Sequence, residues 1–569
     1  GVVVDSGPAS TAGELATAIW VANGANATVD SEAVATTGDF ADGIVVAGIA
    51  DGGTITVDSG VVSTQGRYAD GIFVDAGNAD GVVSSGRMSV SGEGANGLVV
   101  FAYTGDVSIT SGTVESLYAG LFPADADQHG LLAGVSGAGV WGSSNYGNVS
   151  VTSGTVSTLG EGAYGVGAQT GWGTADATGS VYLESGAVDT AGDYAIGLYA
   201  HTTGTGTVTV DSGSVQTAGL NSHGVYAISV QGAVDVSSVS ATTTGDNATA
   251  ILARGSQGVT VRSESVETHG GIHTYENGSV GYTYGILAEG GAGAVVVDSG
   301  SVTTHGEGAT GIRVANGSSA TVGSREVATA GDFADAIVVA GIADGGTITV
   351  DSGSVSTGGR YADGILVTTG AADVAITSEQ VSVSGAGANG IVALSGSGDI
   401  VVESGVVESA YDGAFPEDNA EHSDLASVAG IGVWASSSQG SVQVTSGSVT
   451  TAGEGAYGIG AETGWGVADA TGTVTVSSGS VGTTGDGAYG IYANTSGNGA
   501  VSVDSGQAQT GGDYAIAVFA RSTGTADVEV RSEGVHTTGY NSHGVYAVST
   551  GGSVAVDSGA VATDGDFAY

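Results

Sequence analysis

The chain has 569 residues, with 106 glycines, three prolines and no cysteine, and its formal net charge is −49. Only nine Lys and Arg stand against 58 Asp and Glu, which excludes nucleic acid as a partner because phosphate binding needs clustered cations. Hydrophobic residues make up 41% of the chain, too many for a disordered glycine-rich tract. The absence of cysteine excludes disulfides and thiolate metal sites. No apolar run approaches the roughly 18 to 20 residues of a membrane-spanning helix, so we expect no transmembrane segment in this chain.

A serine recurs about every 25 to 28 residues, usually within a Val-x-Ser-Gly sequence. Self-similarity at a fixed period of this size is typical of solenoids, in which each repeat buries its apolar face by stacking on its neighbours. The 20 marker serines are Ser6, Ser31, Ser59, Ser85, Ser111, Ser153, Ser185, Ser212, Ser238, Ser263, Ser299, Ser324, Ser352, Ser378, Ser404, Ser446, Ser478, Ser505, Ser532 and Ser558.

One clear repeat runs from Thr54 to Val74 and divides into three pieces, 54–60, 61–66 and 67–74. Each piece alternates apolar and polar residues, the pattern of a strand that is buried on one face. β-Branched residues dominate the periodic positions, and glycine is too frequent for an uninterrupted helix. The sequence therefore predicts three short strands in each coil, separated by turns.

These features predict an all-β fold, a right-handed parallel β-helix (β-solenoid) of about 20 coils of 25–28 residues. Right-handed winding is expected from the general preference of parallel crossover connections. We expect residues 1–569 to form one continuous domain, because a one-dimensional array lengthens its core instead of widening it. With coils about 4.8 Å apart, the expected rod is about 95 Å long. The chain begins and stops inside repeats, so we expect it to be a segment of a longer protein.

A small residue stands two positions before a Gly or Ala in the third piece of many repeats. Ser222 and Ser542 take this place in two repeats, which fits an inward corner that accepts only a small side chain. The alanines are Ala41, Ala69, Ala95, Ala163, Ala195, Ala309, Ala334, Ala362, Ala388, Ala456, Ala488 and Ala515.

Aspartate precedes the marker serine in eight repeats, and uncharged residues or arginine in many others, so that a continuous column of repelling carboxylates is avoided. We interpret these aspartates as solvated turn residues and not as a calcium ladder, because no Gly-Gly-x-Gly-x-Asp nonapeptide occurs. No cofactor is expected. Calcium held by surface carboxylates is the one ion that the charge favours. The aspartates are Asp5, Asp30, Asp58, Asp211, Asp298, Asp351, Asp504 and Asp557.

A longer repeat is superimposed on the coil period. Residues 39–46 return at 332–339, and Trp141 and Trp434 share this spacing of 293 residues. Residues 221–224 return at 541–544, a spacing of 320 that differs by 27 residues, or one coil. Insertion of a whole coil keeps every inward side chain inward. We therefore predict an internal duplication of about 21–313 and 314–569.

Loop insertions interrupt the period near 115–140, 168–180, 271–285, 408–434 and 461–473. Loops that project from a rigid scaffold often carry binding residues. Phe-Pro-x-Asp followed by His occurs in two of these loops. One His with a few carboxylates falls short of a metal-ligand set. We therefore interpret these loops as flaps that pack laterally, and not as metal sites. The candidate partner-binding residues are Phe122, Asp125, His129, Trp172, Phe415, Asp418, His422 and Trp465.

Catalysis is not indicated by the sequence. Polysaccharide-cleaving parallel coils collect acids, or Arg with Lys, on adjacent coils, whereas the acids here are spread along the chain and lysine is missing. Gly385-Ala386-Gly387 lacks the following helix of a dinucleotide site. His223 and His543 occupy equivalent positions and are interpreted as turn residues. We expect no enzyme and no catalytic residue.

The pattern Val-x-Val-x-Ser-Gly-x-Val-x-Thr-x-Gly, as in residues 208–219, resembles the Gly-, Ser- and Thr-rich passenger regions of bacterial autotransporters and related large β-helical surface adhesins. The resemblance covers the whole chain and specifies a fold better than a function. It implies export across the outer membrane of a Gram-negative cell, display on the surface or secretion, and roles in adhesion or self-association. It transfers no functional residues to this chain.

These observations together predict a structural or adhesive extracellular surface protein. We expect a rigid acidic rod that mediates self-association, end to end or lateral, or attachment, including attachment to surface glycans. A fibre or a surface layer is one form that such a protein takes. The alternative is a carbohydrate-binding or carbohydrate-processing β-helix protein.

Overall fold

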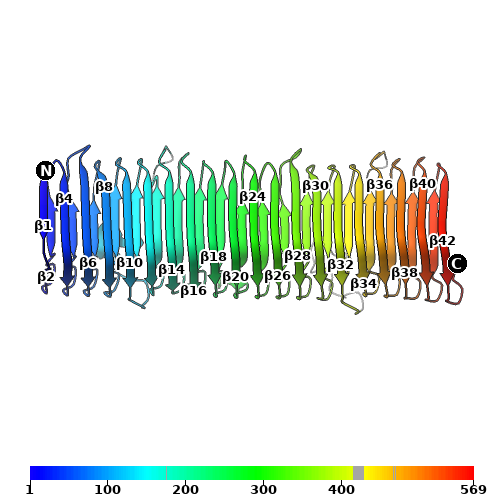
Figure 1. Cartoon of the computed structure of the whole chain (residues 1–569), viewed down its shortest axis with the longest axis horizontal. Helices are drawn as coiled ribbons and strands as arrows, with labels where there is room; N and C mark the ends of the chain where they lie inside the picture. The colour runs from blue at the N-terminus through cyan, green and yellow to red at the C-terminus, as the bar shows by residue number, and fades with distance from the viewer. Residues whose placement is uncertain (173, 175, 414–428, 466, 468, 569) are drawn as a thin grey trace. The chain divides into compact units, whose positions relative to one another are not determined.

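A computed structural model describes residues 1–172, 174, 176–413, 429–465, 467 and 469–568. The fold is an all-β parallel β-solenoid of about 20 turns, as predicted, and its strands form two main parallel sheets (Figure 1). The chain forms two compact units, residues 1–293 and 294–569, and each is described by itself. The right-handed winding and the continuity of the column stay predictions. Among the described helical segments, none has the length and apolar character needed to cross a membrane.

Unit 1 contributes long strands to the first sheet and shorter ones to the second sheet. The first-sheet strands are β1 (Val2–Ser6), β2 (Ala9–Thr11), β4 (Ala27–Thr36), β6 (Thr54–Thr64), β8 (Asp80–Val90), β10 (Val107–Ser116), β12 (Val149–Thr158), β14 (Val181–Ala191), β16 (Val208–Ala218), β18 (Val234–Thr243) and β20 (Val259–Thr268). The second-sheet strands are β3 (Ile19–Ala22), β5 (Ile44–Ala47), β7 (Ile72–Asp75), β9 (Leu98–Ala102), β11 (Val140–Ser144), β13 (Tyr164–Thr170), β15 (Ile196–Thr202), β17 (His223–Ser229), β19 (Ile251–Gly255) and β23 (Tyr284–Glu289). Outside the sheets lie the 3₁₀ segment η1 (Ala126–Val135) and a small antiparallel pair, β21 (His273–Thr274) and β22 (Val280–Gly281).

Unit 2 repeats this plan. Its first-sheet strands are β24 (Val295–Thr304), β26 (Ala320–Thr329), β28 (Thr347–Thr357), β30 (Asp373–Val383), β32 (Ile400–Ser409), β34 (Val442–Thr451), β36 (Val474–Thr483), β38 (Val501–Thr510), β40 (Val528–Thr537) and β42 (Val554–Thr563). Its second-sheet strands are β25 (Thr310–Ala315), β27 (Ile337–Ala340), β29 (Ile365–Thr369), β31 (Ile391–Ser395), β33 (Val433–Ser437), β35 (Tyr457–Thr463), β37 (Tyr489–Thr495), β39 (Ile516–Ser522) and β41 (His543–Ser549).

The marker serines stack in register, which confirms the coil period. In unit 1 each marker pairs with the next from Ser6 to Ser263, and in unit 2 from Ser299 to Ser558. The alternation along β6 buries Ile55, Val57 and Val62. Stacked apolar side chains of this kind form the core of each unit.

Most described coils contain two strands where the sequence suggested three, and the first coil contains three, β1, β2 and β3. The first two predicted pieces form one strand, because the residue after the marker serine bends the strand without ending it; Gly60 has no ladder partner, while Ser59 and Val61 do. A Cβ on Gly60 would lie 2.5 Å from the carbonyl oxygen of Glu32 in the preceding coil, so a side chain at Gly60 would require the backbone to shift. The third predicted piece is a turn followed by a short strand, such as β7 (Ile72–Asp75).

The predicted small-residue corner is confirmed. Every alanine named for it, together with Ser222 and Ser542, is buried. The corner is braced by hydroxyl groups at the end of the first-sheet strand, since the Thr217 hydroxyl donates to the Ser222 carbonyl at 3.0 Å and the Thr304 hydroxyl to the Ala309 carbonyl at 2.5 Å. A bulky side chain at this corner would have to displace the core.

Candidate functional site

The inserted loop between β10 and β11 folds back over the turns of unit 1. It contains three of the predicted site residues, Phe122, Asp125 and His129, and part of it forms η1, which is interrupted at Gly130 with φ 63°. Each of these three side chains has contacts with the solenoid itself. We call residues 117–139 the docked loop.

Asp125 anchors one end of the docked loop to the turn before β7. Its carboxylate forms an ion pair with Arg67 and accepts a hydrogen bond from the Tyr68 hydroxyl at 3.0 Å. Arg67 also pairs with Glu93 at 3.0 Å and lies over the Tyr68 ring, 4.7 Å from its centre. The hydrogen bond from Arg67 lowers the pKa of Asp125, and burial followed by the bond to Asp125 raises the pKa of Tyr68 to about 12.

His129 anchors the loop at a second point, through its contact with Asp70. Its Nε2 lies 3.1 Å from Asp70 Oδ2, and the two side chains are only 6% and 2% exposed. Its ring packs on Tyr68, 4.7 Å between centres. A carboxylate this deeply buried is costly unless it is paired, so the loop histidine satisfies a charge that the solenoid places there.

Asp70 belongs to a column of side chains that link one coil to the next. The Asp42 carboxylate accepts the Asp70 N–H at 2.9 Å, Asp70 accepts the Asn96 N–H at 2.7 Å, and Asn96 accepts the Ala138 N–H at 2.9 Å. Burial, with the nearby Asp70 charge as the second cause, raises the pKa of Asp42 to about 7. Unit 2 repeats the column with Asp335, Asp363 and Asn389.

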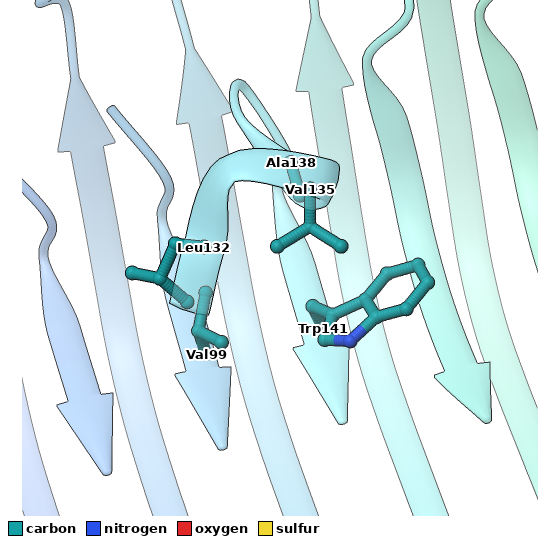
Figure 2. Close-up of a cluster of buried hydrophobic side chains, with 5 residues drawn as sticks. All are labelled: Val99, Leu132, Val135, Ala138 and Trp141. Atoms are coloured by element: carbon teal, nitrogen blue, oxygen red, sulfur yellow. The ribbon is translucent and has the colours of Figure 1, made fainter. Parts of the chain in front are cut away.

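The underside of the docked loop is apolar. Leu132 and Val135 pack against Val99 and Trp141 of the second sheet, together with Ala138 (Figure 2). The loop thus covers outward-facing residues of β9 and β11 that would otherwise be exposed to water. Polar anchors and an apolar underside agree with our interpretation of this insertion as a packing flap.

Trp141 also begins a ladder of aromatic rings along the outer face of the second sheet. Its indole lies over Gly167 of β13, where a Cβ would collide with it, and stacks on Tyr199 of β15 at 5.6 Å. Tyr199 stacks on Tyr226 at 5.6 Å. In unit 2, Trp434 lies over Gly460 in the same way and leads to Tyr492, Phe519 and Tyr546, with near-parallel rings 5.1 to 6.2 Å apart.

The rings of each ladder pack on one another and so leave little ring surface on which a ligand could stack. Because the rings face one another along the column, their faces are occupied by their neighbours. In unit 2 a polar row runs beside the rings: Asn494 donates to Glu462 at 2.7 Å, and Arg521 donates to Asn494 at 2.9 Å. Burial raises the pKa of Glu462, and the two partners oppose that rise.

The remaining predicted residues lie elsewhere. Trp172 and Trp465 are exposed, and Trp172 contacts Phe101 at 6.2 Å between ring centres. Phe415, Asp418 and His422 lie outside the described residues. His223 is the first residue of β17 and not a turn residue; burial lowers its pKa to about 4, and its Nδ1 accepts the Thr249 N–H at 3.1 Å.

Sequence reasoning missed the solenoid side of this site: Arg67, Tyr68, Asp70 and Asp42. The signal was present, because Asp42, Asp70 and Asn96 occupy the same position in successive repeats, directly before a glycine. Comparison of the chain with family models, with curated proteins and with solved structures finds no match.

Proposed function

We propose that this chain is a structural or adhesive extracellular protein of a bacterial surface, an acidic solenoid that mediates self-association or attachment. The observation that carries the proposal is the docked loop. Asp125 and His129 bind inward to the solenoid, while Leu121 is 77% exposed and Phe122 is partly exposed beside it. A rigid scaffold that presents apolar side chains to water has the features of an association surface.

Fixed backbone placement supports this role. The Phe122 N–H donates to Glu161 at 3.3 Å, so the apolar tip is held on the turn of a later coil while Asp125 and His129 hold the rest. Association through a preorganised surface loses little conformational entropy. The net charge of −49 opposes the approach of two copies, so salt or calcium is expected to strengthen association.

Sedimentation velocity over a range of protein concentrations tests the proposal. The double variant Leu121→Ser/Phe122→Ser should shift the protein towards monomer. Leu15→Asn is the matched control, since Leu15 is an equally exposed apolar residue of unit 1 at φ 58°, a conformation that Asn tolerates. Equal association of the wild type and the double variant, or a wild type that stays monomeric with calcium and salt, would contradict the proposal.

The second candidate function is carbohydrate binding, which a groove in unit 2 favours. Carbohydrate processing is the enzymatic form of the same alternative. A glycan turnover screen with purified protein separates the two, because binding without product release leaves the non-enzymatic role in place.

A further inference from the structure

Unit 2 contains a groove across the ends of five neighbouring strands, β32, β34, β36, β38 and β40. Its volume is about 460 Å³. One register column forms its length: Glu408, Thr450, Gly482, Gln509 and His536 are successive ladder partners. With strands about 4.8 Å apart, this column is about 19 Å long.

The hollow exists because Gly482 has no side chain at the middle of the column. The matching column of unit 1 carries a side chain at every step from Glu115 to Thr242, including Asp189. The groove also falls in the stretch where unit 2 has gained a coil, since the spacing of duplicated segments rises from 293 to 320 residues between 472 and 512. The groove is therefore a feature by which the two units differ.

The chemistry of the lining restricts the ligand. No Arg or Lys lines the groove, and with Glu408 in the wall an anionic ligand would be repelled. The lining also holds no large apolar side chain, which disfavours a lipid or a hydrophobic peptide. What it offers is the exposed hydroxyl groups of Thr450, Thr484 and Thr538, the amide of Gln509, the carboxylate of Glu408 and the imidazole of His536, whose Nε2 also lies 3.0 Å from Asp564 Oδ2. This mixture of donors and acceptors suits a chain of neutral hydroxyl groups.

Two tyrosines lie in the turns next to the groove, outside its lining. The turns that begin at the lining residues Gly511 and Thr538 carry Tyr514 and Tyr540. The two rings meet edge to face at 5.6 Å and 77°, which leaves ring surface open to solvent, unlike the rings of the stacked ladder. Tyr514 is 60% exposed although its φ of 59° is unfavourable for a bulky residue.

We propose that this groove binds a neutral oligosaccharide, laid across the coils with its hydroxyl groups on the polar column and a sugar face on the tyrosines of the adjacent turns. The inference deepens the attachment role proposed above by naming the class of partner, and it rests on that role. It assigns no residue to catalysis.

Gly482→Gln provides the sharpest test. A Cβ at Gly482 would meet only Thr450 Cγ2, at 3.8 Å, so the fold accepts a side chain there while the groove is filled. Gly323→Gln is the matched control, because Gly323 is also a strand glycine of unit 2 with room for a Cβ, 3.6 Å from Asp298 Oδ1. Tyr194→Ala, in the matching turn of unit 1, is the control for Tyr514→Ala.

Calorimetric titration of the full chain with neutral gluco-, xylo-, manno- and N-acetylgluco-oligosaccharides should find saturable binding to at least one. Gly482→Gln should weaken it by roughly tenfold or more and Tyr514→Ala by a smaller factor, while both controls bind as the wild type does. Acidic oligosaccharides should not bind. Binding of Gly482→Gln equal to the wild type, binding only of a basic peptide, or no binding of any neutral sugar would overturn the proposal. Sedimentation of the same variants reports self-association separately, so loss of sugar binding with intact association identifies which proposal has failed.

Discussion

The turn at Tyr68 in unit 1 and the turn at Tyr514 in unit 2 have the same backbone and opposite surroundings. Both tyrosines have positive φ, 51° at Tyr68 and 59° at Tyr514, yet Tyr68 is 1% exposed and Tyr514 is 60% exposed. At Tyr68 the docked loop covers the ring and supplies Asp125 to its hydroxyl. At Tyr514 the ring faces solvent, in the turn that begins at the lining residue Gly511. The comparison shows that the same type of solenoid turn can be covered by an inserted loop or remain exposed to solvent.

The largest expected effect is on the covered turn, where the docked loop binds. His129→Ala leaves the Asp70 carboxylate buried without its partner, and we expect the free energy of opening of residues 117–139 to fall by about 3–5 kcal/mol. Amide hydrogen exchange, with β16 as the internal reference, measures it. Adding Asp70→Asn should restore part of the loss, because Asn96 shows that an amide fits this column. Unchanged exchange in His129→Ala would mean that the apolar underside alone holds the loop.

The aromatic ladder beneath the loop comes next. Gly167→Ala places a methyl group against the Trp141 indole, and we expect a loss of about 1–3 kcal/mol of stability. Thermal unfolding and near-ultraviolet circular dichroism report the loss and the unstacking. Gly460→Ala should act alike in unit 2. Trp141→Val should rescue Gly167→Ala, since valine already occupies this column at Val99; failure of the rescue would place the strain elsewhere.

A smaller effect depends on pH. The pKa of Asp42 is raised to about 7 in the fold, so its protonated form stabilises the native state fully below about pH 4, and this stabilisation is lost as pH rises through 7. Asp42→Asn keeps the acceptor for the Asp70 N–H and cannot ionise. We therefore expect it to gain about 1–2 kcal/mol at pH 8 and almost nothing at pH 3.5. Asp106→Asn, an exposed acceptor of the Asn148 N–H, is the control; a gain for Asp42→Asn that is the same at both pH values would contradict this account.

The smallest effect sharpens the open side of the comparison. Tyr514→Asn should raise stability by about 0.5 kcal/mol, because asparagine accepts positive φ better than a bulky ring and little burial is lost. Tyr194→Asn, at φ 60° in unit 1, should behave alike. Denaturant unfolding of both variants provides the measurement. A loss of stability in Tyr514→Asn would show that contacts of the exposed ring stabilise the fold by more than its positive φ costs.

The regular part of this molecule was predictable from its sequence. Period-two alternation fixes which side chains point inward, and the serine spacing fixes the register, so the core columns and the alanine corner followed directly. The number of strands did not follow, because glycine after the marker serine reads as a turn signal and in the fold is a bend within β6. The meeting of His129 with Asp70, 59 positions apart, depends on how an inserted loop folds back, and no periodic pattern encodes that path. Predicting the groove at Gly482 would have required knowing both the strand register and the absence of a side chain at this position.

Because every coil keeps the same register, the length of the solenoid can change by one whole coil at a time. Excision of residues 485–511 would join the end of β36 to the turn at Gly512, recreating the order found after β14, and each remaining strand would still meet a neighbour of matching edge. Such a shortened chain keeps its interior and keeps Gly482, but it loses Gln509 from the column beside it. Gain or loss of single coils is thus a route by which a protein of this type changes the side chains around a recess without redesigning its core.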